Sequence, residues 1–188
     1  YYVYPEYQEY LRKADIISIQ IGSNDALVPC IVGLGEATNW KSEQLAALMV
    51  SGALRDFNFQ KLGLFLEALN RMTLTFDESR ATNRLLFRGM DEICDQAYTN
   101  VTASLPQIVA SIRALNPDAK IVLLATPIRC SAAALDRYFS KLNRFAKDLA
   151  AQEGLIYVDI PRAQTAADGH PTVKGHQYIA QQILNAIQ

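Results

Sequence analysis

Two short segments of the chain carry residue types on which a reactive site could be built. The first is Gly22-Ser23-Asn24-Asp25, which directly follows the apolar run IISIQI. The second is DGHPTVKGH, residues 168–176, which contains both histidines of the protein. Histidine exchanges protons near neutral pH and is therefore suited to acid–base chemistry. The question is whether these two segments belong to one site.

The elements that would position these segments are visible as apolar patterns. Three runs predict strands, at residues 16–21, 120–127 and 155–160, and the first is apolar enough to predict a strand covered on both faces. The predicted helices are 1–13, 42–57, 59–72, 91–116 with a break or kink near Pro106, 132–153 ending before Gly154, and 172–187. This order of strands and helices predicts parallel strands joined by right-handed crossovers.

Each predicted strand ends in polar residues. The first ends at Gly22, the second at Thr126-Pro127, and the third leads through Asp159 towards the histidine segment. The carboxyl ends of parallel strands meet at one edge of a sheet, and ligands bind beyond that edge. The sequence therefore predicts that both polar segments face one site. Each segment alone also has a simpler interpretation, because Gly, Asn and Asp often do no more than form a turn.

Composition and charge narrow the range of functions. The chain has 188 residues, 50% of them apolar, with 18 basic and 19 acidic side chains and a formal charge of −1. This balance gives no electrostatic reason to expect nucleic acid as a partner, and no apolar run is long enough to predict a transmembrane segment. The three cysteines stand far apart, at positions 30, 94 and 130, without the spacing of a metal site or a disulfide framework. We expect them to act as small buried hydrophobes.

The two polar segments resemble sequence blocks of the GDSL or SGNH hydrolases, which are serine esterases, lipases and acyl-carbohydrate esterases. Gly22-Ser23-Asn24-Asp25 resembles the strand-Gly-x-Asn-Asp block, and DGHPTVKGHQYIAQQI resembles the Asp-x-x-His-Pro block with its terminal helix. The resemblance covers residues 14–25 and about 91–188. It implies a flavodoxin-like three-layer α/β/α fold with a parallel sheet, forming a single domain over 1–188.

The resemblance also implies roles for individual residues. Gly22 would supply a backbone N–H and Asn24 its side-chain amide to an oxyanion hole. His170 would be the general base and Asp168 the residue that orients it, while Asp25 would support the turn. His176 is expected to have a structural role. The resemblance implies neither a metal nor an organic cofactor.

The sequence departs from the family pattern in two places. Asp168 and His170 are two positions apart, where the family usually has three. The Gly-Asp-Ser block, which carries the nucleophile, does not precede Gly22, and the chain starts at Tyr1 rather than at a methionine. We expect that the first strands and the serine belong to a segment upstream of Tyr1 or to a companion chain. Ser23 and Ser131 are disfavoured as substitutes, because neither follows a strand in a strained strand-to-helix turn.

Residues 26–90 fall outside the resemblance and are predicted to form a helical insertion or lid beside the site. The aromatic residues of this region are candidates for a substrate wall, namely Trp40, Phe57 and Phe65. The alternative is that they form the core of a small helical subdomain.

The sequence therefore predicts hydrolysis of a carboxylic ester, with a lipid, aryl or acyl-carbohydrate substrate. Two alternatives remain open: an acyltransferase that uses the same site, and a non-catalytic binding module on a degraded hydrolase fold. The sequence identifies neither the acyl group nor the compartment.

Overall fold

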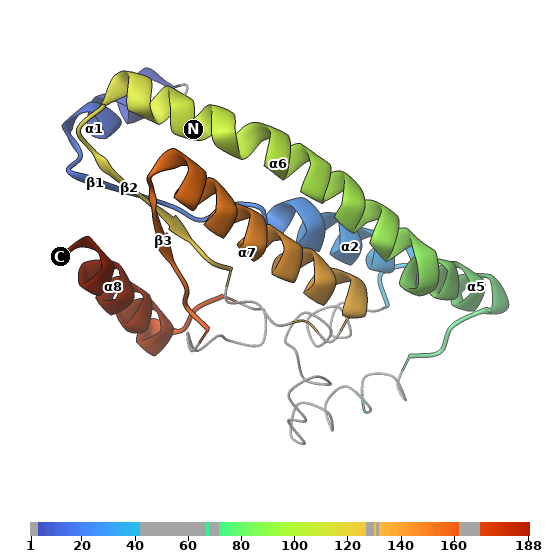
Figure 1. Ribbon diagram of the computed structural model, residues 1–188. Coiled ribbons are helices and arrows are strands. Elements are labelled where there is room, and N and C mark those ends of the chain that lie inside the picture. The colour runs from blue at the N-terminus through green and yellow to red at the C-terminus, as the bar shows by residue number, and fades with distance from the viewer. Residues whose placement is uncertain (1–3, 42–66, 68–71, 127–129, 131, 162–169) are drawn as a thin grey trace.

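A parallel sheet of three strands organises the protein in the computed structural model (Figure 1). The structure describes residues 4–41, 67, 72–126, 130, 132–161 and 170–188. The strands are β1 (Ile16–Ile19), β2 (Lys120–Leu124) and β3 (Ile156–Val158), in the order β1-β2-β3. All three match predicted strands and are parallel, as the sequence indicated.

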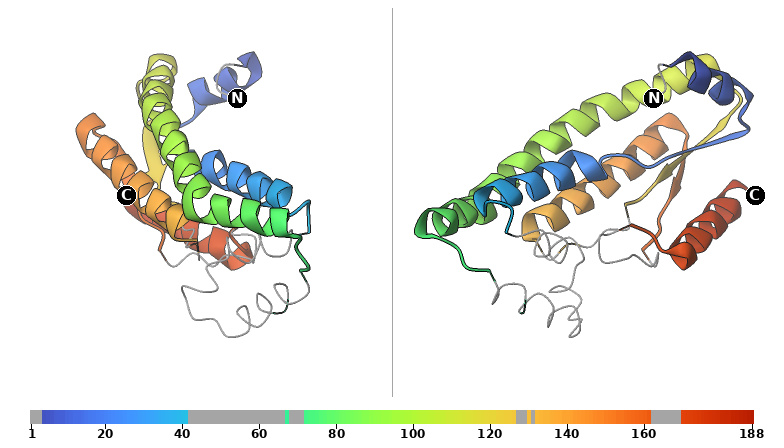
Figure 2. Two further views of the ribbon diagram at one scale, coloured as in Figure 1. Left: turned by 90° about the vertical axis from the view of Figure 1, so that its right-hand side faces the viewer. Right: turned by 180° about the vertical axis from the view of Figure 1, so that it is seen from behind.

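Helices lie on both faces of this sheet. They are α1 (Pro5–Lys13), α2 (Ser23–Ala37), α5 (Phe76–Arg84), the π-helical turn η1 (Leu85–Gly89), α6 (Met90–Leu115), α7 (Ala133–Glu153) and α8 (Val173–Ile187). Helices α6 and α7 lie on one side and α8 on the other, as the view from behind shows (Figure 2). The three-layer α/β/α arrangement predicted from the sequence is therefore present.

The register of the sheet decides which side chains face α6 and α7. Ile17 lies beside Ile121, and Ile19 lies beside Leu123. These side chains pack under a set of buried residues from the two helices, namely Leu105, Val109, Ile112, Ala146, Leu149 and Ala150. Every second side chain of β1 and β2 therefore packs against the apolar faces of α6 and α7.

The opposite face of the sheet is covered unevenly. Ile179 of α8 packs against Val122 and Val158, which belong to β2 and β3. In β1, Ile16 is 41% exposed and Ser18 is also exposed. The prediction that the first strand is covered on both faces is therefore wrong in this structure, because β1 stands at the edge of the sheet and α8 does not reach it.

A second core, formed mainly by helices, lies beyond the carboxyl ends of the strands. It joins α2, α6 and α7, and all three cysteines are buried in it, as expected of small hydrophobes. A hydrogen bond to the sulfur of Cys94, together with burial, raises the pKa of the Cys30 thiol. The three cysteines, distant in sequence, therefore contribute buried side chains to one core at the junction of three helices.

Helices α1, α6, α7 and α8 agree closely with predicted helices, whereas α2 and α5 were not predicted as separate helices. Helix α6 continues through Pro106 without interruption, and Gly154 ends α7 in a left-handed conformation (φ 63°). The predicted helices at 42–57 and 59–72 lie essentially outside the described residues. Among the helices that the structure describes, none has both the length and the apolar character needed to cross a bilayer.

The buried side chain of Asn116 connects the start of the sheet to α1. Its amide nitrogen donates to the carbonyl oxygens of Leu11 (2.8 Å) and Ala14 (2.9 Å), and its amide oxygen accepts from the Ala119 N–H (3.2 Å). The beginnings of β1 and β2 are thereby held together at the edge of the sheet opposite the polar segments.

Candidate active site

Gly22 forms the turn between β1 and α2 in a conformation that favours glycine. Its φ of 96° and ψ of −14° place it in the left-handed region, and it is the N-cap of α2. A Cβ atom at this position would lie 2.6 Å from Cδ2 of Leu142. Both the backbone conformation and the close approach of α7 therefore require a residue without a side chain.

Tyr138 of α7 holds this turn in place. Its buried hydroxyl donates a hydrogen bond of 2.6 Å to the carbonyl oxygen of Gly22. Burial, reinforced by the negative charge of Asp25, raises the pKa of the Tyr138 hydroxyl. The phenol therefore keeps its proton and remains a donor throughout the physiological pH range.

Two amide side chains fix the ends of the strands next to this turn. The Asn143 amide oxygen accepts from the Thr126 N–H (2.8 Å), and its amide nitrogen donates to the Thr126 carbonyl (3.1 Å). The Gln20 amide donates to the carbonyl oxygen of Ala125 (2.7 Å). Helix α7 thus holds the carboxyl end of β1 through Tyr138 and that of β2 through Asn143.

The residues after Gly22 form the first turn of α2. Ser23 is half-buried, whereas Asn24 and Asp25 are exposed to solvent. Asp25 lies in the first turn of α2, where the positive end of a helix dipole stabilises a carboxylate, and its supporting role in the turn stays a prediction. The exposed amide of Asn24 and the N-terminus of α2 together offer hydrogen-bond donors at the edge of the sheet.

His170 lies at the same edge, on the other side of β2. It is exposed, and it stands just before α8, whose start lies beside the end of β3 (Figure 1). Thr172 caps α8 by accepting a hydrogen bond from the Gly175 N–H (3.2 Å). The structure therefore brings Gly22, Asn24 and His170 to one edge of the sheet, although from strands that are not neighbours.

Only some of the remaining predicted site residues lie in the described part of the chain. Asp168, Phe57 and Phe65 lie outside the described residues. Trp40 is 53% exposed and packs its indole against Gly35, at the end of α2 opposite to Gly22. His176 is exposed one turn into α8. The assignment of roles to these residues and to His170, Gly22 and Asn24 stays a prediction, as does the lid formed by residues 26–90.

Sequence reasoning missed Tyr138 and Asn143. A signal for them exists, since both carry polar groups directly beside the buried apolar residues Phe139 and Leu142 of α7. A polar group within a buried stripe needs a hydrogen-bond partner, and here the partners are backbone groups at the strand ends. Among the described residues, no group of three or more His, Cys, Asp or Glu side chains is placed to hold a metal ion.

The fold and the edge described above define an α/β protein with a polar turn after one strand and a histidine before the last helix. A family model described as the GDSL-like lipase/acylhydrolase family matches residues 5–178. The chain therefore belongs to this family of hydrolases, as the resemblance of its two polar segments predicted. No curated protein and no solved structure matches it.

Two glycines in the described part of the chain are left-handed, Gly22 and Gly154, and they allow a matched test of the Gly22 turn. Gly22→Ala should destabilise the protein by about 2–4 kcal/mol, because it combines backbone strain with a clash against Leu142. Gly154→Ala should cost only about 1 kcal/mol, since nothing lies within 4 Å of its added Cβ atom. Urea denaturation measures both values, and equal losses would show that α7 does not constrain the turn.

Removal of one hydroxyl tests the anchor between α7 and the turn. Tyr138→Phe leaves the buried Gly22 carbonyl without its donor and should lower the free energy of unfolding by about 1–3 kcal/mol. Tyr178→Phe, at a half-buried tyrosine of α8, is the control and should have little effect. Thermal denaturation of both variants measures the difference, and an unchanged Tyr138→Phe variant would contradict the anchoring role.

Proposed function

We propose that the protein hydrolyses carboxylic esters at the carboxyl edge of its sheet, with a serine nucleophile, His170 as general base and an oxyanion hole formed by Gly22 and Asn24. The observation that carries this proposal is the left-handed Gly22 turn, which opens α2 at this edge and is held from behind by Tyr138. Membership of the hydrolase family supports cleavage of ester and acyl bonds in general.

The proposed reaction begins with proton transfer from the serine hydroxyl to His170 as the serine oxygen attacks the ester carbonyl. The negative charge that develops on the carbonyl oxygen would be stabilised by the Gly22 N–H, the Asn24 amide and the positive end of the α2 dipole. His170 then gives its proton to the departing alcohol, and water hydrolyses the acyl-enzyme by the same steps. Asp168 would orient the imidazole during both transfers.

The nucleophile is proposed to arrive on a strand that pairs with the outer edge of β1. In the described part of the chain, β1 is bonded to a strand on one side only, and Ile16 is 41% exposed. Backbone N–H and C=O groups that lack hydrogen-bond partners along an apolar strand destabilise the fold, and they can pair with a further strand. A strand added there would end beside Gly22, where an attacking serine is needed.

The proposed substrate is an ester with a lipid, aryl or acyl-carbohydrate part. Hydrophobic side chains from residues 26–90 would contact that part, with Trp40, Phe57 and Phe65 as the candidates. The proposed catalytic residues at the edge of the sheet would determine that an ester bond is cleaved. The hydrophobic side chains from residues 26–90 would determine which of these substrates binds.

Two histidines in similar positions provide a matched test of the base. His170→Ala should lower ester hydrolysis about 10⁴-fold or more, as loss of a triad base does. His176→Ala removes the other, exposed histidine only one turn into α8 and should leave the rate unchanged. The assay is hydrolysis of p-nitrophenyl acetate, and the rate of each recombinant variant is compared with that of the unaltered protein purified from its natural source. Similar rates for the two variants would remove His170 from the mechanism.

Labelling with a fluorophosphonate identifies the nucleophile directly. Peptide mapping of the labelled natural protein should place the modified serine outside residues 1–188, on polypeptide joined to or tightly associated with this chain. Modification of Ser23 or Ser131 would contradict the proposed strand at β1. Absence of labelling would favour a non-catalytic binding module on this fold.

A further inference from the structure

A groove of about 740 Å³ lies at the end of α2 that is remote from Gly22. Its walls are the last turns of α2, helix α5, η1 and the start of α6. At a rise of about 1.5 Å per residue, the α2 wall starts roughly 15 Å along the helix from the Gly22 turn. The groove is therefore separate from the candidate active site.

Three arginines line one side of this groove. Arg80 and Arg84 belong to α5 and Arg88 to η1, and all three are exposed. Their spacing of four residues places them on one face of the helix, where like charges repel one another. An anion bound between them would remove this repulsion.

None of these arginines forms an ion pair within the described residues, although other cations nearby do. Glu78, beside the arginine row, is bound by Lys41 at 2.8 Å. Asp91, just beyond it, is bound by Arg137. Glu78 and Asp91 are thus neutralised by other residues, whereas Asp77 and Glu92 line the groove without a direct ion pair to its arginines in the described residues. The guanidinium groups of the groove therefore keep their hydrogen-bonding capacity.

The shape of the groove depends on two glycines that meet the same leucine. A Cβ atom on Gly33 of α2 would lie 3.3 Å from Cδ1 of Leu85, and one on Gly89 would lie 3.0 Å from it. Leu85 begins the π-helical turn, a rare conformation that is frequent at functional sites. The absence of a side chain at Gly33 allows α2 to approach Leu85 of η1 closely at the base of the groove, and the absence of one at Gly89 leaves room for the same leucine within η1.

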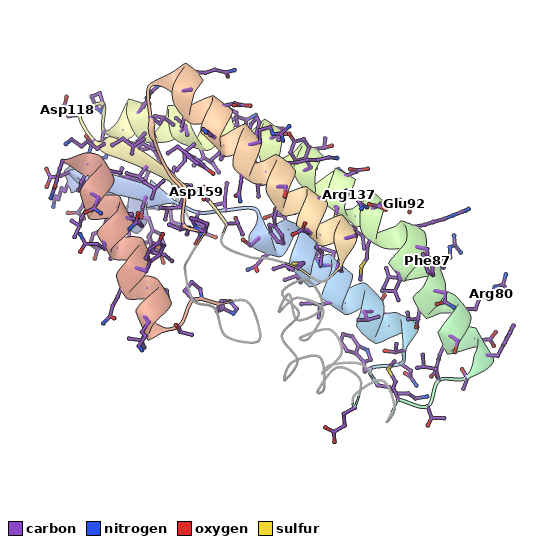
Figure 3. All side chains as sticks on the ribbon, turned by 60° about the horizontal axis from the view of Figure 1, so that its bottom comes forward. Arg80, Phe87, Glu92, Asp118, Arg137 and Asp159 are labelled. Carbon is purple, nitrogen blue, oxygen red and sulfur yellow. The ribbon has the colours of Figure 1, made fainter. Side chains whose placement is uncertain are left out.

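Aromatic and acidic side chains complete the surroundings. Phe76 and Phe87 are 81% and 79% exposed, next to the arginine row, and Figure 3 shows Arg80, Phe87 and Glu92 following one another along this helical arm. Glu36, Asp77 and Glu92 also line the groove. These carboxylates balance the arginine charges and accept hydrogen bonds, so they favour a ligand with hydroxyl groups over a bare polyanion.

We propose that this groove binds the phosphate ester of a polyol, with Arg80, Arg84 and Arg88 on the phosphate and the carboxylates on the hydroxyl groups. Guanidinium groups match phosphate oxygens with paired hydrogen bonds, which a row of three offers at several positions. The same chemistry occurs in a free polyol phosphate and in the headgroup of an anionic phospholipid. The exposed phenylalanines would contact the acyl region in the second case.

The test uses glycerol 3-phosphate in calorimetry and phosphatidylcholine vesicles with and without phosphatidylglycerol in a sedimentation assay. Arg84→Gln should weaken binding about tenfold, the effect of losing one charge-assisted contact. The triple variant Arg80→Gln, Arg84→Gln, Arg88→Gln should not bind. The control variant Arg12→Gln, Arg144→Gln, Lys147→Gln removes the same charge from exposed positions elsewhere and should bind as the unaltered protein does.

Each outcome decides the proposal. Binding of the soluble ester that the arginine variants lose supports a small-molecule site, and binding confined to phosphatidylglycerol vesicles supports a lipid headgroup. Equal losses in the triple variant and in its control would show only a general charge effect and overturn the proposal. Absence of binding in both assays would also overturn it, and neither result depends on ester hydrolysis.

Discussion

The contact between α7 and the Gly22 turn is the constraint on which the rest of the candidate site depends. The Tyr138 hydroxyl binds the Gly22 carbonyl at 2.6 Å, and Leu142 leaves no room for a side chain on Gly22. One turn further along α7, Asn143 binds both backbone groups of Thr126. A single amphipathic helix therefore sets the relative positions of two strand ends, which determines where α2 begins and where its hydrogen-bond donors point.

Much of this arrangement could be predicted because its signals are local. Continuous apolar runs marked the three strands, and the stripe through Phe139 and Leu142 marked α7. Gly154 and Thr172 ended and began helices where their conformational preferences indicate. The parallel order of the strands followed from the alternation of strands and helices, and this order alone predicts that both polar segments lie at one edge of the sheet.

What could not be predicted depends on partners far apart in the chain. Tyr138 lies 116 positions from Gly22, and no local pattern indicates that pairing. The one-sided cover of β1 has a similar origin, because IISIQI is apolar enough for a buried strand and only the position of α8 reveals that Ile16 is exposed. The gathering of the three cysteines in one core likewise depends on how α2, α6 and α7 cross.

Helix α2 connects the two functional regions proposed for this protein. Its N-terminus opens at the Gly22 turn, and its last turns form one wall of the arginine groove. Between them, Ala26, Leu27 and Cys30 are buried against α6 and α7, so the helix is held along its length. Nothing in the α2 turn itself provides a nucleophile, because the strained residue is Gly22 and Ser23 follows it as an ordinary helical residue. In the proposed mechanism, the oxyanion donors and the attacking serine would therefore come from different segments. In the described part of the chain one edge of β1 has no paired strand, and a second segment that paired there would complete the sheet and the proposed site together.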